Sequence, residues 1–373
     1  MKLLNFEERI RGRTKMKILQ ICPGAYQSGR GGISEHIRNI SERLAKRHEV
    51  TVYATNPAST LRWFETVNGV KVRRFKRFSP SGSYFFSPNM IISLREESFD
   101  VVHGHSYHAL PIHFAFLTKH RKLVFSTHFH GAGHTALRES LFRLFKPIGK
   151  MSLRKADAII AVSEFEKRTL CNSFDIDLSK IFVIPNGVNI SEFAGLKRGQ
   201  SACRSILYVG RLERYKGVKH LVEAMPILDD AYLTIVGTGP QRRNLEALAR
   251  QLQVQDRVFF LQDLSRKTLL QTYVDSDVLV LLSEHEAYSM VVAEALVART
   301  PCVVANTAAL SEWVDNKSCF GIDLPINRQK LIELINRVIE TRRKGKLAFQ
   351  EKIKSKIPDW NSVVEQLERV YAQ

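Results

Sequence analysis

The feature that most constrains the fold is an alternation of strand-like and helix-like segments that runs along the chain twice. Short apolar runs rich in β-branched residues are each followed by a longer segment whose apolar residues recur at helical spacing. Strands connected through helices form parallel sheets, because the chain must cross back before the next strand begins. The pattern predicts an α/β protein of two Rossmann-like, doubly wound domains that hold ligands at the carboxyl ends of their strands, across a cleft.

The two runs of this alternation set the expected domain boundaries. Residues 1–15 precede the first strand and are expected to be an N-terminal extension. Residues 16–196 form the first domain, the polar stretch KRGQSAC is the linker, and residues 203–357 form the second domain. A last helix is expected within residues 358–373.

The individual elements follow from the periodicity. In the first domain, strands are expected at KILQICP, EVTVYAT, VVHGH, KLVFSTH, ADAIIAVS and IFVIPNGV, with a short basic hairpin at VKVRRFKRF. Helices there are expected at ISEHIRNISERLAKRH, at 88–98, at 108–119 and from Glu164. In the second domain, strands are expected at ILYVG, AYLTIVGTG, VFFLQ, VLVLLS and PCVVAN, and helices at 217–226, 240–253, 265–274 and 288–298.

Composition and charge limit where the protein can be located and which partners it can bind. The 44% hydrophobic and 25% charged residues are those of an ordinary globular protein, and no apolar run is long enough to span a bilayer. The five cysteines form no CxxC pair, and the charged start is unlike a signal peptide, so we expect a cytoplasmic protein. The net charge of +19 favours phosphates or an anionic surface, and residues 1–190 carry 30 basic against 15 acidic side chains.

Several motifs occur together in the order of a known family. They are VIPNGVN, RSILYVGRLERYKGVKHLVEAM, LTIVGTGP and DVLVLLSEHEAYSMVVAEAL. With them the chain, from residue 16 onward, resembles the family 4 retaining glycosyltransferases, which have the GT-B fold. The resemblance implies transfer of a hexose from a nucleotide sugar without a metal ion, and a last helix that crosses back to the first domain.

Two glutamates, Glu286 and Glu294, are the strongest candidates for ligand contact. Glu286 stands in the turn after an expected strand and Glu294 in the helix that follows. Carboxylates accept hydrogen bonds from sugar hydroxyls, although acidic residues near a helix start are also common as solvated charges. The resemblance implies that Glu286 contacts the donor sugar and that Glu294 holds the ribose.

The start of that helix is a candidate anion site. Backbone amides at Tyr288, Ser289 and Met290 are placed to meet a donor diphosphate. The family often has glycines flanking the aromatic residue, whereas this chain has Ala287 and Ser289. Donor binding is expected here with a geometry altered by these side chains.

Arg211 and Lys216 are candidates for stabilising the leaving group. They follow the strand ILYVG, where a parallel sheet presents side chains to a ligand. Positioned cations stabilise the charge that develops on a departing diphosphate, whereas the alternative is ordinary surface charge in a basic protein. Since no DxD-like pair stands in an obvious loop, we expect neither a metal nor another cofactor.

Glycines mark two further loops. Gly31 and Gly32 stand between the first strand and its helix, and Gly237 and Gly239 follow a strand of the second domain. Each pair lets a backbone come close to a phosphate or sugar, so all four are candidate donor contacts. The first loop is not GxGxxG and no acidic residue follows EVTVYAT, which disfavours a dehydrogenase.

Histidines cluster after two strands of the first domain: His103, His105, His128, His130 and His134. Five histidines on two neighbouring strand ends could bind a metal, but no cysteine or carboxylate completes an obvious tetrahedral set, so no metal site is expected. The resemblance places one of these histidines against the donor sugar, with His128 the first candidate and His130 close behind. His105 and His130 are candidates for contact with the acceptor or the donor sugar. For His103 and His105, a structural role in the core is the alternative.

A basic amphipathic stretch, LRESLFRLFKPIGKMSLRK, is expected to be a helix broken at Pro147. Its alternation of apolar and cationic residues suits the surface of an anionic membrane, and a solvated basic face is the alternative. We therefore expect a cytoplasmic protein that lies on the inner face of the membrane. No nucleic-acid-binding motif is present, so no nucleic-acid partner is expected.

The function expected from these features is retaining transfer of a hexose from a UDP- or GDP-sugar to a glycan or lipid-linked acceptor of cell-surface glycoconjugates. His128, Glu286, Arg211 and Lys216 are the expected catalytic residues, and no carboxylate stands where a covalent intermediate would need it. A nucleotide-sugar epimerase remains an alternative. So does a non-catalytic basic module of the same fold that binds nucleic acid or glycan.

Overall fold

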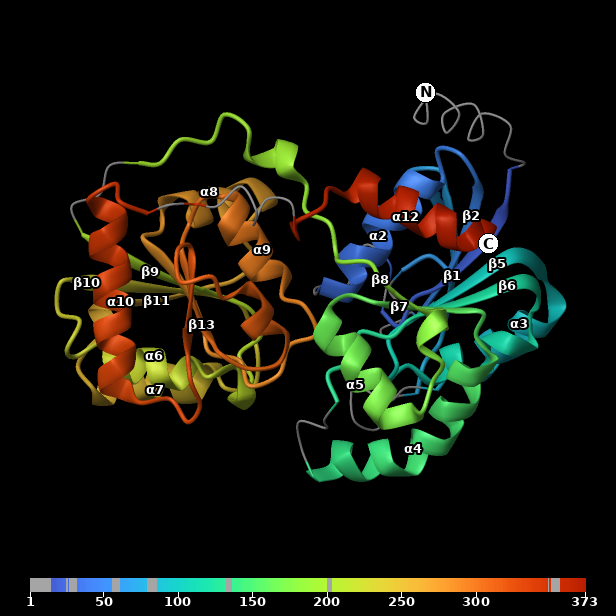
Figure 1. The fold of residues 1–373 in the computed structure, drawn as a ribbon, viewed down its shortest axis with the longest axis horizontal. Helices are drawn as coiled ribbons and strands as arrows, with labels where there is room; N and C mark the ends of the chain where they lie inside the picture. The colour runs from blue at the N-terminus through green and yellow to red at the C-terminus, as the bar shows by residue number, and fades with distance from the viewer. Residues whose placement is uncertain are drawn as a thin grey trace. The chain divides into compact units, whose positions relative to one another are not determined.

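The computed structural model describes residues 15–24, 26, 32–55, 61–78, 86–131, 136–199, 203–347, 349 and 356–373, without the side chains of 136–142. The chain forms two compact units, each built on its own sheet (Figure 1). The first unit comprises the chain up to Val162, then Lys167–Ile184 and Trp360–Gln373. The second comprises Ser163–Glu166 and Pro185–Asp359.

The first unit contains a sheet of eight strands in the order β3-β4-β2-β1-β5-β6-β7-β8. The strands are β1 (Lys17–Ile21), β2 (Glu49–Thr55), β3 (Phe64–Val67), β4 (Val70–Phe75), β5 (Ser98–His105), β6 (Lys119–Ser126), β7 (Ala158–Ala161) and β8 (Ile181–Val183). All neighbours pair in parallel except β3 and β4. Since the chain moves outward from β1 in one direction and then restarts at β5 in the other, β1 and β5 flank the switch point of this sheet.

The helices of the first unit are α2 (Gly32–Leu44), α3 (Pro88–Glu96), α4 (Ala136–Lys155), α5 (Glu164–Phe174) and α12 (Trp360–Ala372), with 3₁₀ helices η1 (Leu110–Leu117) and η2 (Leu178–Lys180). Helix α5 begins in residues assigned to the second unit. Apolar side chains between sheet and helices form a closed core, exemplified by Leu19, Val102 and Phe125, which are almost completely buried. This core fixes the positions of the strand ends, where polar side chains emerge.

Three local predictions for the first unit were wrong. Residues 110–117 form a 3₁₀ helix rather than an α-helix, with Pro111 in its first turn. The stretch VKVRRFKRF is not itself a hairpin, because VKVRRF forms the single strand β4 and pairs with β3 across a turn at Asn68 and Gly69. Helix α4 continues through Pro147 instead of breaking there.

The second unit contains a sheet of six parallel strands in the order β11-β10-β9-β12-β13-β14. The strands are β9 (Arg204–Val209), β10 (Ala231–Val236), β11 (Val258–Leu261), β12 (Val278–Leu281), β13 (Cys302–Ala305) and β14 (Cys319–Ile322). The switch point lies between β9 and β12, from which the strand order proceeds in opposite directions. Residues that follow these two strands are therefore placed to share a ligand site.

The helices of the second unit are α6 (Val218–Ala224), α7 (Arg242–Gln251), α8 (Arg266–Asp275), α9 (Met290–Val297) and α10 (Arg328–Arg343). Its 3₁₀ helices are η3 (Ile190–Phe193), η4 (Arg214–Lys216), η5 (Gln255–Arg257) and η6 (Ala308–Trp313). The predicted helices of this domain all occur, with bounds that differ by a few residues. The pair β14 and α10 extends the alternation beyond the last predicted strand, PCVVAN.

The domain boundary differs from the prediction. We expected the first domain to end at residue 196 and the second to begin at 203, whereas the second unit begins at Pro185. The segment after β8, including η3, contacts α8 of the second unit, and Gln271 Nε2 donates to the carbonyl oxygen of Lys197 at 2.9 Å. The stretch KRGQSAC therefore follows a segment that already belongs to the second unit.

Helix α12 is part of the first unit, although more than 170 residues of the second unit precede it in the chain. It lies beside α2, as the red and blue helices in Figure 1 show. Its Tyr371 hydroxyl is 2.7 Å from Nδ1 of His103, and its Glu368 Oε1 is 3.0 Å from Nε2 of His48. The C-terminal segment thus buries polar groups that belong to the centre of the first sheet.

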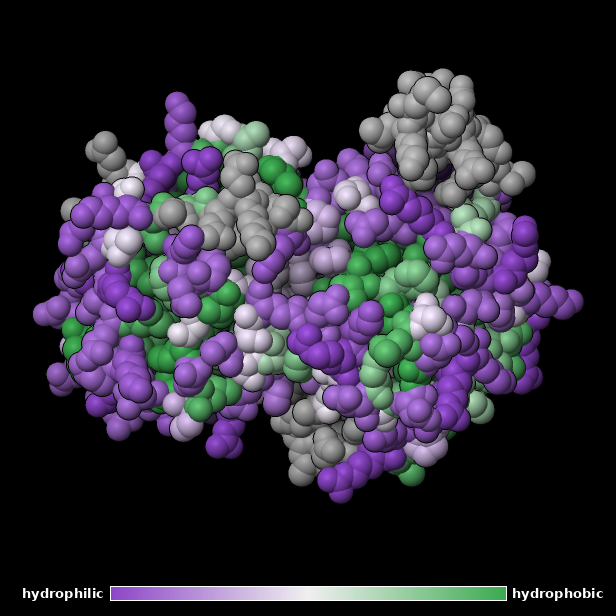
Figure 2. All heavy atoms as spheres, in the orientation of Figure 1, coloured by the Kyte–Doolittle hydropathy of each residue, from purple (hydrophilic) through white to green (hydrophobic). Residues whose placement is uncertain are grey.

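The surface is polar over most of the visible face of each unit, with hydrophobic residues scattered among charged ones (Figure 2). Among the helices that the structure describes, none combines the length and the apolar character needed to cross a membrane.

Candidate functional site

The switch point of the second sheet brings charged residues from distant parts of the chain together. Lys216 follows β9, and Glu286 follows β12. Nζ of Lys216 lies 2.6 Å from Oε1 of Glu286, and both side chains are less than one-fifth exposed. Burial alone lowers the pKa of Lys216, but the nearby carboxylate outweighs burial and raises it, so the ammonium stays charged.

Gly217 makes this ion pair possible. Its φ of +68° is left-handed, and a Cβ there would lie 2.5 Å from the carbonyl oxygen of Leu282. The backbone nitrogen of Glu284 also donates to the carbonyl oxygen of Tyr215 at 2.9 Å. The loops after β9 and β12 therefore touch through their backbones, which aligns Lys216 with Glu286.

Gly237 and Gly239 have a steric role that the sequence alone did not reveal. A Cβ at Gly237 would lie 1.9 Å from the carbonyl oxygen of Gly210, and a Cβ at Gly239 would lie 2.5 Å from that of Leu212. We expected these glycines to approach a nucleotide directly. In the structure they first let the loop after β10 pack on the loop that carries Arg211.

Arg211 is the most accessible of the predicted cations. Its side chain is 65% exposed, and its Nη2 lies 2.7 Å from Oε1 of Glu213. The Tyr208 hydroxyl donates to its carbonyl oxygen at 2.8 Å, which fixes the backbone while the guanidinium remains on the surface. Since an exposed ion pair contributes at most about 1 kcal/mol, the guanidinium can leave Glu213 for a ligand phosphate.

Glu294 lies on α9, is nearly buried, and has a cationic partner that the sequence analysis missed. Nη1 of Arg266 lies 2.6 Å from its Oε1, and Nε of Arg266 lies 2.8 Å from Oε2 of Glu192. Burial alone would lower the pKa of Arg266, but the two carboxylates outweigh burial and raise it. Arg266 thus connects the carboxylate predicted to hold ribose with η3.

The turn before α9 is held firmly. Ser289, with a φ of +82°, caps the helix, because its hydroxyl accepts from the backbone nitrogen of Val292 at 3.5 Å. The carbonyl oxygen of Tyr288 accepts from Nε1 of Trp313 at 2.7 Å, and the carbonyl oxygen of Ala287 accepts from Oγ of Ser163 at 2.6 Å. Side chains therefore bind carbonyl groups of this turn. Met290 is the first residue of α9 and lies at the positive end of the helix dipole.

The switch point of the first sheet gathers histidines instead of charges. His103 and His105 end β5, His128 follows β6, and His36 lies on α2. The Nε2 atom of His103 lies 2.9 Å from Oγ of Ser126, and its Nδ1 meets Tyr371 as described above, so both nitrogens have partners. Burial lowers the pKa of His103, His105 and His128 well below the ordinary value, and these rings are neutral at physiological pH.

The other predicted residues of the first unit lie outside the histidine cluster or outside the described residues. Gly32 begins α2 and is exposed, while Gly31 and His134 lie outside the described residues. The ring of His130 is half-buried, and its centroid lies 5.7 Å from that of His108 rather than within the cluster around His105. His36 was not among the predicted site residues, although it follows Gly32 by one helical turn, a spacing that places both on the same face of α2.

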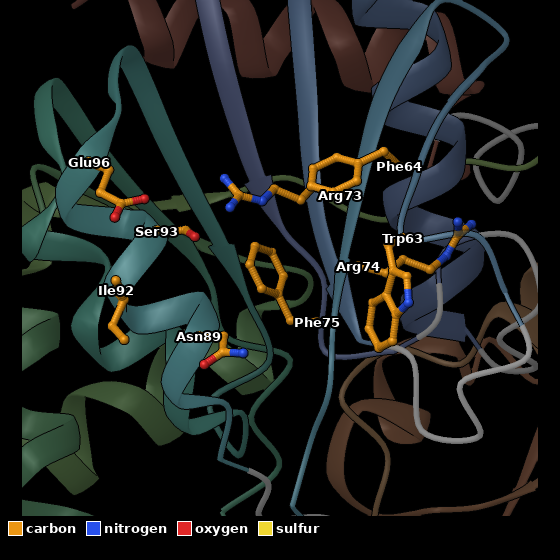
Figure 3. A pocket seen from close by; sticks show the side chains of 9 residues that line it. All are labelled: Trp63, Phe64, Arg73, Arg74, Phe75, Asn89, Ile92, Ser93 and Glu96. Carbon is orange, nitrogen blue, oxygen red and sulfur yellow. The ribbon is translucent and has the colours of Figure 1, made fainter.

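A separate open pocket lies between the β3–β4 hairpin and α3 (Figure 3). It has a volume of about 330 Å³ and is lined by Trp63, Phe64, Arg73, Arg74, Phe75, Asn89, Ile92, Ser93 and Glu96. Nη1 of Arg73 lies 3.1 Å from Oε1 of Glu97, and its guanidinium lies over the ring of Phe75. This pocket was not predicted from the sequence.

Comparisons with known proteins identify the family and agree with the fold. Residues 30–192 match the family described as Glycosyltransferase Family 4, and residues 201–356 match Glycosyl transferases group 1. An uncharacterised glycosyltransferase of Methanocaldococcus jannaschii is 30% identical over 314 residues, which cover 77% of this chain and 80% of that protein.

Two solved structures share the architecture. Sucrose-phosphate synthase from Thermosynechococcus elongatus has a TM-score of 0.79 at 20% identity, covering 95% of this chain and 98% of that one. Anabaena HepE in complex with UDP-glucose has a TM-score of 0.76 at 17% identity, covering 96% of this chain and 99% of that one.

Two doubly wound α/β units, together with the match to these solved structures, show that the chain has the GT-B fold. The chain belongs to the family 4 glycosyltransferases of group 1 and is a glycosyltransferase.

Proposed function

We propose that this glycosyltransferase moves a hexose from a nucleotide sugar to a glycan or lipid-linked acceptor with retention of the anomeric configuration, and without a metal ion. The observation that carries the proposal is the close Lys216–Glu286 pair at the β9/β12 switch point, with Arg211 in the same loop as Lys216. A positive and a negative group held together there match a donor whose diphosphate is anionic and whose sugar presents hydroxyls.

Each side chain has a role in this proposal. Arg211 and Lys216 stabilise the charge that builds on the nucleoside diphosphate as it leaves. Glu286, beside Lys216, accepts a hydrogen bond from a hydroxyl of the donor sugar. Glu294 accepts from the ribose hydroxyls, and the amides at the start of α9, near Met290, meet the diphosphate.

The bond changes take place on one face of the sugar. The bond between the anomeric carbon and the diphosphate oxygen breaks, and the acceptor oxygen bonds to the same carbon on the side from which the diphosphate departs. The acceptor proton goes to a donor phosphate oxygen. His128 orients the donor sugar as a neutral imidazole, which is consistent with the lowered pKa that burial gives it.

The donor is proposed to be a UDP-sugar in preference to a GDP-sugar. Support comes from the Anabaena protein of the same fold, which was solved in complex with UDP-glucose. Arg211 and Lys216 would meet the diphosphate of either donor, so they support a nucleotide sugar without choosing the base.

An acceptor presented at the inner face of a membrane, within cell-surface glycoconjugate synthesis, is supported by α4. Leu144 and Met151, seven residues apart on this helix, are exposed at 69% and 44%, and Arg143, Lys146 and Arg154 are exposed beside them. Apolar side chains flanked by cations suit a lipid–water boundary that carries negative charge. We propose that the protein is cytoplasmic and binds this surface peripherally.

The test is donor binding and slow hydrolysis across UDP-, GDP- and ADP-sugars in the presence of EDTA, with product analysis by NMR. Wild-type protein should bind and hydrolyse one of these donors, and Glu294→Gln should lose most of that affinity. Glu340→Gln, an exposed glutamate on α10, is the matched control and should behave as wild type. If no nucleotide sugar binds, the proposal fails and a non-catalytic module replaces it, whereas an epimerised nucleotide sugar would identify an epimerase.

A further inference from the structure

Three imidazoles converge at the switch point of the first sheet. His36 reaches in from α2, His105 from the end of β5, and His128 from the turn after β6. One ring nitrogen of each lies within 4.8 Å of one nitrogen of each of the others. The ring centroids are 5.4 Å apart for His36 and His105, and 5.1 Å apart for His36 and His128.

Gln20 sets the tautomer of His105. Nε2 of His105 lies 2.6 Å from Oε1 of Gln20, whose Nε2 donates in turn to the Tyr371 hydroxyl at 3.3 Å. Since a carboxamide oxygen only accepts, the proton of His105 is on Nε2 and its Nδ1 carries a lone pair. That Nδ1 is buried and has no hydrogen-bond partner among the residues described.

His128 presents a second such nitrogen. Its Nε2 is buried without a hydrogen-bond partner in the described part of the chain. The residue also has a φ of +47°, a conformation that costs energy for a side chain other than glycine. Two unsatisfied nitrogens and one strained backbone at the same place indicate a missing ligand, because buried polar groups are normally paired.

His36 completes the set from a rigid position. It is 1% exposed on α2, and its ring packs edge-on against that of Trp360 at 5.6 Å. The three rings therefore approach one another from three different elements of the first unit. The outer hydrogen bond from His105 to Gln20 is of the kind that orients metal-binding histidines.

We propose that His36, His105 and His128 bind a divalent transition metal ion of the zinc class, with the fourth position open. Zinc–nitrogen bonds of about 2.0–2.1 Å in tetrahedral geometry place ligand nitrogens about 3.4 Å apart, so small ring rotations close the observed spacing. Neutral imidazoles, with no carboxylate grouped with them among the residues that the structure describes, favour zinc, cobalt or nickel over magnesium or calcium.

The site is inhibitory rather than catalytic, and this part rests on the proposed function. A metal ion on Nε2 of His128 would take that ring away from the donor sugar. Metal binding is therefore expected to block transfer reversibly, which is consistent with a reaction that uses Arg211 and Lys216 in place of a metal.

The binding test uses full-length protein stripped with EDTA and titrated with Co²⁺ alone. One ion per chain should give the visible d–d absorption of tetrahedral cobalt, and Zn²⁺ should displace it. His36→Gln and His105→Gln should abolish the band, Gln20→Ala should weaken affinity roughly 10–100-fold, and His220→Gln on the surface of the second unit should retain it. Absence of the band in wild type, or its persistence in both histidine variants, overturns the proposal.

A measurement on the wild type guards against variants that fail to fold. X-ray absorption of the zinc-loaded protein should show three imidazole nitrogens in the first coordination sphere, and a shell dominated by oxygen or sulfur would contradict the site. Transfer assays with and without Zn²⁺ then separate the two proposals. Bound zinc without inhibition refutes the inhibitory role, whereas absence of transfer with every donor refutes the proposed function and leaves the cobalt result standing.

Discussion

The two units hold their polar groups at equivalent places, the switch points of their sheets, by opposite means. In the second unit, Lys216 and Glu286 are charged and paired, with Arg211 on the surface nearby. In the first unit, His105 is buried, His128 is half-buried, and both are neutral. An anionic ligand needs compensating charge, whereas a neutral hydroxyl or a metal needs lone pairs, so the two switch points are suited to different kinds of ligand chemistry.

The largest expected effect concerns buried charge in the second unit and is measured as a loss of stability. Asp277, completely buried at the start of β12, accepts from Nη2 of Arg343 at 2.8 Å and also bonds Arg198. Burial alone would raise its pKa, but hydrogen bonds from Arg343, Ser205 and Arg198 outweigh burial and lower it. Asp277→Ala should reduce the free energy of unfolding by about 3–5 kcal/mol in urea denaturation, because it leaves cations without their partner.

The control for that experiment is Asp256→Asn, an exposed carboxylate on η5 that should change stability by less than about 0.5 kcal/mol. A loss of similar size in both variants would show that the ion pairs of Asp277 contribute no more to the free energy of unfolding than an exposed carboxylate does.

The second prediction tests the charged site through activity. Lys216→Met should lower kcat/KM about 10²–10³-fold, because it removes a preorganised cation from the leaving group. Lys219→Met, an exposed residue three positions later, is the matched control and should retain wild-type rates. Equal rates for wild type and Lys216→Met with the donor identified above would refute the role of this ion pair.

The third prediction concerns the neutral histidines. His113 on η1 is buried, with Nδ1 2.6 Å from Oγ of Ser152, and burial lowers its pKa to about 4. The unfolded chain takes up a proton near the ordinary pKa of about 6.5, whereas the folded chain does so only near 4. Between these values the unfolded state binds more protons, so stability is lost as pH falls from about 6.5 to 4, by about 3 kcal/mol from this residue.

Urea denaturation at pH 7, 5.5 and 4.5 measures the effect. His113→Gln should show a shallower loss between pH 7 and 4.5 than wild type, while His220→Gln, at an exposed histidine, should show the wild-type slope. Identical slopes for wild type and His113→Gln would show that burial does not lower the pKa of His113 in the folded state.

Local sequence patterns predicted much of the fold on which this comparison depends. The alternation of short apolar runs and amphipathic helices predicted both sheets, and the positions of Glu286 after a strand and Glu294 in the next helix agree with the structure. Those features depend on neighbours within about ten residues, where side-chain periodicity decides the conformation.

Partners across the fold were not predictable in the same way. Lys216 and Glu286 are 70 residues apart, and Arg266 lies 28 residues before Glu294. His36 joins His105 and His128 only because β1 and β5 are neighbours in the sheet. Such contacts arise from strand order, which the periodicity of a single segment does not encode, and the same holds for the packing of Gly237 against Gly210.

The smallest expected effect tests how the charged site is supported. Glu192 and Arg266 are both more than one-third exposed, and exposed pairs contribute about 0.2–1 kcal/mol. Glu192→Gln should therefore raise the KM of the donor at most about fivefold with kcat unchanged, because Arg266 loses one anchor and orients Glu294 less well. Glu340→Gln supplies the control. A large fall in kcat would instead place Glu192 among the groups that act in the transition state, and the division between a charged catalytic pair and its supporting residues would have to be redrawn.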